Sequence, residues 1–314
     1  MRIFKHLFFS LLILGFAYSG FSQDNNNEED TLKPIVNYNN HKGFNLGFYI
    51  GSFWANKQTA SLYDGYGFDQ NGQQNNFANS LLLYQINYVG GRFGGNDLIA
   101  QLLNVDTKDW DFTEKDMPIN MRYITTYLVG LNTQYKINKK SSFSLNINGT
   151  KLKATGKFTI TTKIPTGSGL LQAPNTAFTI NGEEQRLMFQ FGYKRYFGKN
   201  EKINFLLEGG INIILSKAQK NQVIMHSDLN NGQNDIYIDL MNLYQQPPYN
   251  FYSARYLVGA GIGFFAGAGI NFNINPKYSL QFLYNPSYDR IALGYFPKFK
   301  MQHGCGLRVY YNMN

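Results

Sequence analysis

Apolar and polar residues alternate strictly in many strand-length segments of this chain. In 143–148, for example, Phe143, Leu145 and Ile147 alternate with small polar residues. Successive side chains of a β-strand point to opposite faces, so each such segment predicts a strand with one apolar and one polar face. The same pattern recurs in 123–137, 186–194, 203–213, 278–285 and 299–311, and less cleanly in 43–54. With the glycine-rich stretch 256–270, the pattern predicts about eight strands.

The connections between these segments alternate between short and long. Short polar turns are expected at 138–141, 198–201 and 275–277, and long loops at 56–120, 165–182, 220–253 and 290–298. Short turns at one end and long loops at the other are typical of bacterial transmembrane barrels. The expected fold is therefore all-β: a closed, antiparallel, up-and-down transmembrane β-barrel of about eight strands with long extracellular loops. The segment 151–163 is also strand-like and is expected to rise above the membrane.

The alternation continues into the last residues, Tyr310-Tyr311-Asn312-Met313-Asn314. From Gly43 onward the chain resembles the small OmpA/OmpX-type and PorT-like outer-membrane barrels, in which the final strand ends in an aromatic residue. Here the terminal residue is Asn314 rather than Phe. The resemblance implies a barrel in the outer membrane of a Gram-negative cell. It transfers no functional residue, because it rests on the pattern alone.

The N-terminal residues read as a targeting signal. A basic start with Arg2 and Lys5 precedes an apolar core of ten residues and then small residues, which is the secretory pattern. We expect a signal peptide at 1–22, a flexible periplasmic leader at 23–42 and the barrel at 43–314. The formal net charge of +9 could suggest nucleic-acid binding, but a secreted chain with scattered basic residues argues against that partner.

Charged residues on the inward faces predict an ion-pair network in the lumen. Glu208, Arg308 and Lys194 all fall on the polar side of their segments. A barrel of about eight strands is just wide enough for side chains to fill it, so enclosed charges need partners. We expect Glu208 to pair with Arg308 and Lys194, mainly in a structural role.

The first long loop contains two helix-like segments, 80–89 and 96–103, with cap-like residues at Asn79, Asn96 and Asp97. Both have more apolar residues than a solvated loop exposes. Two interpretations remain open: the loop folds over the barrel mouth and buries its own apolar face, or it forms a docking surface for an envelope protein or another ligand. The residues of such a surface would be Leu82, Leu83, Ile86, Leu98, Ile99 and Leu102.

No motif predicts catalysis, a cofactor or a metal. The acidic stretch 106–116 lacks the spacing of a calcium loop. Three consecutive residues, His226-Ser227-Asp228, cannot readily form a catalytic relay. The expected function is a non-enzymatic binding or scaffold component of the cell envelope, in contact with outer-membrane lipid and acting through its long loops. The alternatives are a membrane-embedded lipid-modifying enzyme and a narrow pore.

Overall fold

The computed structural model describes residues 42–69, 73–163, 175–198, 202–226, 235–243, 257–294 and 298–313. The predicted signal peptide and nearly all of the predicted leader lie outside these ranges, so both remain predictions. The first strand begins at Gly43, where the barrel was expected to start.

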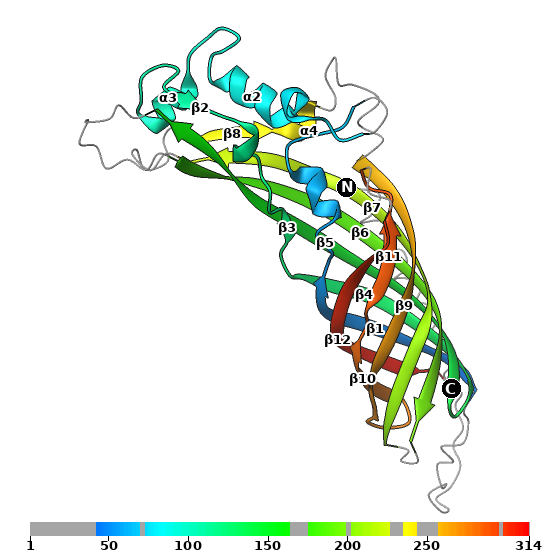
Figure 1. Ribbon diagram of the computed structural model, residues 1–314. Coiled ribbons are helices and arrows are strands. Elements are labelled where there is room, and N and C mark those ends of the chain that lie inside the picture. The colour runs from blue at the N-terminus through cyan, green and yellow to red at the C-terminus, as the bar shows by residue number, and fades with distance from the viewer. Residues whose placement is uncertain are drawn as a thin grey trace, which may run out of the picture. The chain divides into compact units, whose positions relative to one another are not determined.

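The strands form a closed ring (Figure 1). Its members are β1 (Gly43–Trp54), β4 (Thr126–Asn138), β5 (Ser141–Thr162), β6 (Asn175–Phe197), β7 (Ile203–Met225), β9 (Val258–Asn273), β10 (Tyr278–Tyr284), β11 (Ser287–Ile291) and β12 (Lys300–Asn312). From β1 to β9, each pairs antiparallel with the next ring strand along the chain. Both β10 and β11 pair with β9 and with β12, so together they occupy one position.

Closure comes from β12, which pairs with β1 from Asn45↔Asn312 to Trp54↔His303. Among the described residues the ring therefore has eight positions, and the predicted antiparallel up-and-down barrel is confirmed. A closed ring leaves no strand edge unpaired, which is the condition for a sheet to cross a lipid bilayer.

The outside of the ring is apolar and its inside is polar. Phe48, Phe205 and Phe264 are examples of large outward side chains that stay exposed, while their strand neighbours Tyr49, Leu206 and Phe265 are buried. Inward positions carry mostly amides, hydroxyls and charges, including Asn132, Asn146, Gln190, Asn212, Asn271, Gln281 and Arg308. No helix in the described ranges is long and apolar enough to cross a membrane.

Three strands are much longer than the others. β5, β6 and β7 have 22, 23 and 23 residues, against 12 in β1 and 13 in β4. The pairing of β4 with β5 ends at Thr150, but β5 and β6 stay paired as far as Thr161↔Asn175. The short strand β8 (Ile236–Asp239) then pairs with the end of β7.

Three predicted loop boundaries are wrong. Residues 175–182 belong to β6, residues 220–225 belong to β7 and residues 290–291 belong to β11, although all three ranges were expected in loops. The expected strand at 151–163 is present as the outer part of β5. The reason is that the sheet continues beyond the barrel, where helices rather than lipid cover one of its faces.

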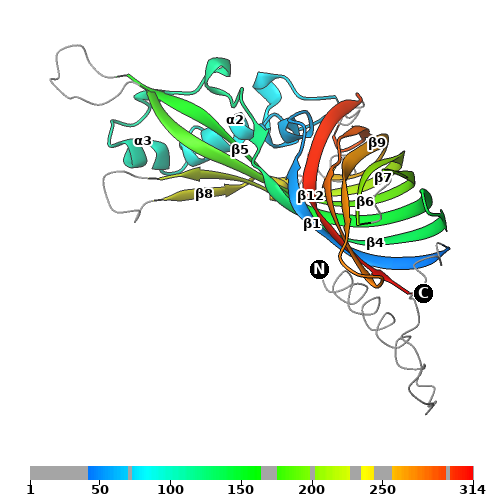
Figure 2. The same cartoon turned by 90° about the horizontal axis from the view of Figure 1, so that it is seen from below.

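These helices and short strands come mainly from the connection between β1 and β4 (Figure 2). They are η2 (Thr59–Tyr63), η3 (Phe77–Asn79), α2 (Leu81–Val89), α3 (Leu98–Leu103), β2 (Trp110–Asp111), η4 (Glu114–Asp116) and β3 (Arg122–Tyr123), joined by α4 (Leu240–Leu243) from the connection after β7. We call residues 55–69 and 73–125, β8 and α4 the cap, together with β5 after Thr150 and the parts of β6 and β7 that pair alongside it, 175–185 and 217–225.

Local sequence explains the two longer helices of the cap. The Ser80 hydroxyl accepts the Leu83 amide at 3.3 Å, so the cap residue of α2 is Ser80 rather than the expected Asn79. Asp97 accepts the Ala100 amide at 2.9 Å and starts α3. Each interaction satisfies a backbone donor that would otherwise be unpaired at a helix start.

The helices bury their apolar residues against the extended sheet. Leu82 and Ile86 of α2 share one hydrophobic core with Phe158 of β5, Ile180 of β6 and Val223 of β7. Two layers around one core are the usual way for an amphipathic sheet to become stable in water. The first connection is thus a folded unit on top of the barrel.

Candidate functional site

The three charged residues predicted for the lumen meet there. Arg308 Nη1 lies 2.8 Å from one carboxylate oxygen of Glu208, and Lys194 Nζ lies 3.8 Å from the same oxygen. The other oxygen of Glu208 accepts hydrogen bonds from Ser144 Oγ at 2.6 Å and Asn146 Nδ2 at 3.1 Å. All these side chains are buried, so the charges compensate one another with little help from water.

Further hydrogen bonds cross the barrel at the same depth. Lys194 donates to Gln134 at 3.2 Å and to the hydroxyl of Tyr310 at 3.1 Å. Gln281 donates to Tyr196 and Asn271 at 3.2 and 2.9 Å. Side chains from β4, β6, β9, β10 and β12 thus fill this level of the lumen.

A second buried network joins the barrel to the cap. Arg186 of β6 donates to Glu184 at 2.5 Å, to Gln302 of β12 at 2.5 Å and to Thr59 of η2 at 2.7 Å. The Tyr123 hydroxyl contacts both Glu184 and Thr59. Sequence reasoning missed this network, because its members lie far apart along the chain. It holds η2 against the barrel strands β6 and β12.

The six apolar residues proposed as a docking surface lie mostly inside the cap. Leu82, Ile86, Ile99 and Leu102 are buried, Leu83 is half-buried, and only Leu98 is exposed. In this arrangement the four buried residues cannot contact a partner. The reason is that the loop folds onto the extended sheet and buries its own apolar face, which is the other interpretation of the sequence.

The opposite side of α2 carries an exposed aromatic patch that sequence reasoning did not single out. We define it as Tyr84, Tyr88 and Phe93; the side chains of Tyr88 and Phe93 are each 61% exposed. The rings of Tyr84 and Phe93 lie 5.6 Å apart. Arg92, at its border, lies 4.4 Å over the ring of Trp110. Helical spacing places residues 84 and 88 on one face, so the pattern itself was available in the sequence.

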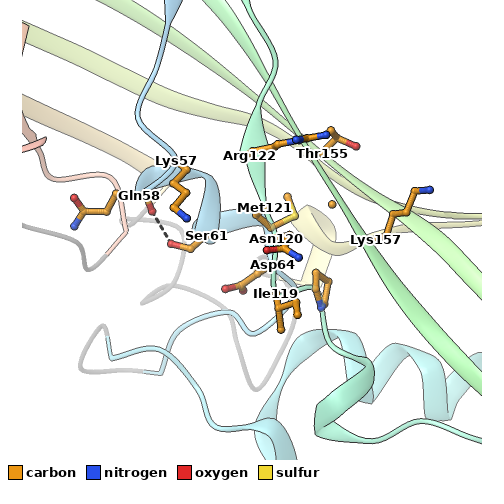
Figure 3. A pocket seen from close by; sticks show the side chains of 12 residues that line it. Lys57, Gln58, Ser61, Asp64, Ile119, Asn120, Met121, Arg122, Thr155 and Lys157 are labelled. Atoms are coloured by element: carbon orange, nitrogen blue, oxygen red, sulfur yellow. Dashed lines mark hydrogen bonds between the residues drawn. The ribbon is translucent and has the colours of Figure 1, made fainter. Parts of the chain in front are cut away.

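A cavity of about 820 Å³ opens in the cap between η2, residues 118–122 and the edge of β5. Figure 3 shows the side chains around it. Cations come from three separate segments: Lys57 precedes η2, Arg122 belongs to β3 and Lys157 belongs to β5. Gln58, Ser61, Asp64, Ile119, Asn120, Met121 and Thr155 complete most of the lining.

Asp64 is the only carboxylate among the described residues of this lining. It accepts hydrogen bonds from the Tyr66 amide at 2.9 Å and from Gln74 at 2.8 Å. Burial raises the pKa of Asp64 to about 7, because the charged form is poorly solvated there. Its negative charge is therefore only partly developed near neutral pH.

The described part of the chain contains no group of three His, Cys, Asp or Glu side chains placed to hold a metal ion. Of the trio His226-Ser227-Asp228, only His226 lies in the described ranges, and it pairs with Asp235 at 2.6 Å.

The closed ring, with an apolar outer face and a polar, charge-paired interior, decides the architecture. The protein has the fold of a small outer-membrane β-barrel. No family model matches the sequence, and no curated protein matches it. Among solved structures, the chain is similar to the outer membrane protein OprG from Pseudomonas aeruginosa, with 9% identity and a TM-score of 0.37 over 87% of this chain and 98% of that one.

Two further similar structures are Ail, the attachment invasion locus protein of Yersinia pestis, and Neisserial surface protein A. Ail has 10% identity and a TM-score of 0.30, with 86% of this chain and 96% of that chain covered. Neisserial surface protein A has the same identity and coverages with a TM-score of 0.31. Sequence identities and TM-scores this low say nothing about the function, and the assignment of the fold rests on the strand pairing described above.

Proposed function

We propose that this barrel is a non-enzymatic binding or scaffold component of the outer membrane, which presents its cap to another protein of the cell envelope. The observation that carries the proposal is the aromatic patch formed by α2 and the turn after it. Its residues stay exposed, whereas Leu81, Leu82 and Ile86 on the other side of the helix are buried in the core of the cap. Exposed aromatic clusters bordered by Arg are enriched in protein–protein interfaces.

The proposed location follows from the apolar outer face and from the secretory pattern at residues 1–22. We propose that the signal peptide is cleaved after Ser22 and that the cap lies outside the cell. Intact-mass measurement of the protein purified from outer membranes should give a chain that begins at Gln23. A chain retaining residues 1–22 would contradict the cleavage.

Site-specific photo-crosslinking tests the docking role of the patch. A photoreactive residue replaces Tyr88 in the tagged chain, and the matched control carries the same residue at Lys115, an exposed position of η4. We expect one discrete crosslinked protein with position 88 and none with position 115. The same crosslink from both positions, or no crosslink from either position, would contradict the proposal. An unchanged yield of the position-88 crosslink in the Phe93→Ser variant would also contradict it.

The pore alternative is disfavoured by the hydrogen bonds that cross the lumen at Lys194 and Gln281. In planar bilayers we expect no discrete conductance steps from the purified protein. Regular steps that disappear on unfolding would favour the pore. For the lipid-modifying alternative, a lipid A profile that changes on deletion of the gene would favour the enzyme.

A further inference from the structure

The cavity in the cap exists because one stretch of the β5 edge lacks a strand partner. β3 pairs with Ala154 and Thr155, and β2 pairs with Thr161 and Thr162. Between them, residues 118–121 run past β5 without forming a strand in the described structure. At Gly156 a Cβ atom would lie 2.2 Å from Met121 Sδ, so the glycine is what lets Met121 pack here.

The lining of this cavity has an excess of positive charge. Lys57, Arg122 and Lys157 are all exposed, and within the described residues none of them forms an ion pair with a carboxylate. Asp64 is buried and already accepts two hydrogen bonds. Three cations from separate segments around one hollow attract an anion more strongly than the same charges spread over a flat surface.

The lining also has an apolar part. Ile119 is 82% exposed, the highest value among the large apolar side chains of the described residues, and the buried Met121 follows two positions later. Ser61 donates to the Gln58 carbonyl at 2.6 Å, so the proton of its hydroxyl is already engaged (Figure 3). A ligand that uses the whole cavity would contact both the cations and Ile119.

From this geometry we infer that the cavity binds a phosphate-bearing amphiphile, with its phosphate at Arg122 in the field of the lining cations Lys57 and Lys157 and its apolar part against Ile119. Arg presents a planar fork that fits two phosphate oxygens, and the two lysines of the lining add positive charge around it. The inference goes beyond the proposed function, because it concerns a small ligand and needs no protein partner. The ligand could be a lipid of the surrounding leaflet or a soluble phosphate ester, and the two share this chemistry.

Isothermal titration calorimetry of the full chain in a neutral maltoside detergent tests the inference. The probes are hexyl phosphate, inorganic phosphate and hexanol. We expect hexyl phosphate to bind at least tenfold more tightly than inorganic phosphate, hexanol not to bind, and added salt to weaken binding. Equal affinity for hexyl phosphate and inorganic phosphate would overturn the amphiphile part, and no binding of any probe would overturn the whole inference.

Two variants and a matched control locate the binding. Lys57→Gln/Arg122→Gln/Lys157→Gln should weaken hexyl phosphate at least tenfold. The control Lys115→Gln/Lys140→Gln/Lys277→Gln removes the same charge elsewhere and should bind like wild type. Ile119→Ser should weaken hexyl phosphate but not inorganic phosphate. Circular dichroism and tryptophan fluorescence verify that each variant is folded. Equal losses in the two triple variants would show non-specific attraction and refute the site.

The source of the ligand follows from a competition experiment in nanodiscs. Monophosphoryl lipid A in phosphatidylcholine nanodiscs should reduce hexyl phosphate binding if the site takes its ligand from the leaflet. Unchanged binding in these nanodiscs identifies a soluble phosphate ester instead. Either result retains the phosphate chemistry, which the calorimetry tests independently.

Discussion

Glu208→Gln offers the sharpest test of how the barrel interior is held together. The substitution keeps the size of the side chain but removes the negative charge that lies 2.8 Å from Arg308 and 3.8 Å from Lys194. Two buried cations then face each other without a counter-charge. Breaking a buried pair in this way costs about 3–5 kcal/mol. We expect the free energy of unfolding to fall by that amount.

The double variant Glu208→Gln/Arg308→Met separates charge from packing. It removes one positive and one negative charge together, and Lys194 keeps hydrogen bonds to Gln134 and Tyr310. Because only one of the two cations then remains without a counter-charge, the free energy of unfolding of the double variant should fall by about 2 kcal/mol less than the sum of the losses of the two single variants.

Reversible urea unfolding in lipid vesicles, followed by tryptophan fluorescence, measures the stability of the wild type, the two single variants and the double variant, which together form a double-mutant cycle. Glu183→Gln is the matched control, since Glu183 pairs with Lys151 at 2.5 Å but both are partly exposed. An exposed pair contributes about 1 kcal/mol or less. Additivity within about 0.5 kcal/mol, or equal losses at positions 183 and 208, would refute the reasoning.

Three further predictions concern the cap. Burial raises the pKa of Asp64 to about 7, so the charged form of Asp64 disfavours folding. The contribution of Asp64 to the stability of the cap should be greatest below about pH 4 and should decrease as the pH rises towards 7. Thermal unfolding of Asp64→Asn should lack this pH dependence. Gly182→Ala should destabilise the cap by about 1–3 kcal/mol, because the new Cβ would lie 2.2 Å from the Tyr63 ring. Gly149→Ala is the control and should not destabilise the protein, because its Cβ would have no neighbour closer than 4.0 Å. The proteolysis rates of the two variants test the difference. Asp97→Ala should lower the free energy of unfolding by about 1–3 kcal/mol, because the Trp110 indole and the Ala100 amide at the start of α3 both lose their acceptor. An unchanged emission spectrum of Trp110 would contradict this prediction.

The ring and its interior could be predicted because alternation reports directly which face a side chain occupies. Glu208 lies five residues from the start of β7 and Arg308 four residues from the end of β12, so their depths could also be matched from the sequence. The extent of the strands could not be predicted in the same way. Alternation alone predicts a strand throughout 141–162 and does not mark where the barrel stops. The mark is a shift of the apolar residues from odd positions, such as Phe143 and Ile147, to even positions, such as Leu152 and Phe158. The shift arises because the buried face of β5 is polar in the lumen and apolar under the helices.

The role of α2 illustrates a different limit. Apolar and aromatic residues surround this helix, with Leu82 and Ile86 on one side and Tyr84 and Tyr88 on the other. The sequence predicts a helix but does not say which side meets the sheet, so it left open whether Leu82 and Ile86 are buried within the cap or form a docking surface. The cavity had no local signal at all, because its cations come from three segments up to 100 positions apart, from Lys57 to Lys157.

Strand length separates the cap from the barrel. A transmembrane β-strand needs roughly 9–11 residues, so β5, β6 and β7 each have about half of their length outside the bilayer. The helix η2 joins the two parts: Thr59 hydrogen-bonds Arg186 above the lumen, while Gln58, Ser61 and Asp64 line the cavity. A shift of η2 therefore cannot change the cavity without also changing the contacts of Arg186 with β12. The barrel strands β6 and β12 are thus connected to one wall of the cavity through Arg186 and Thr59.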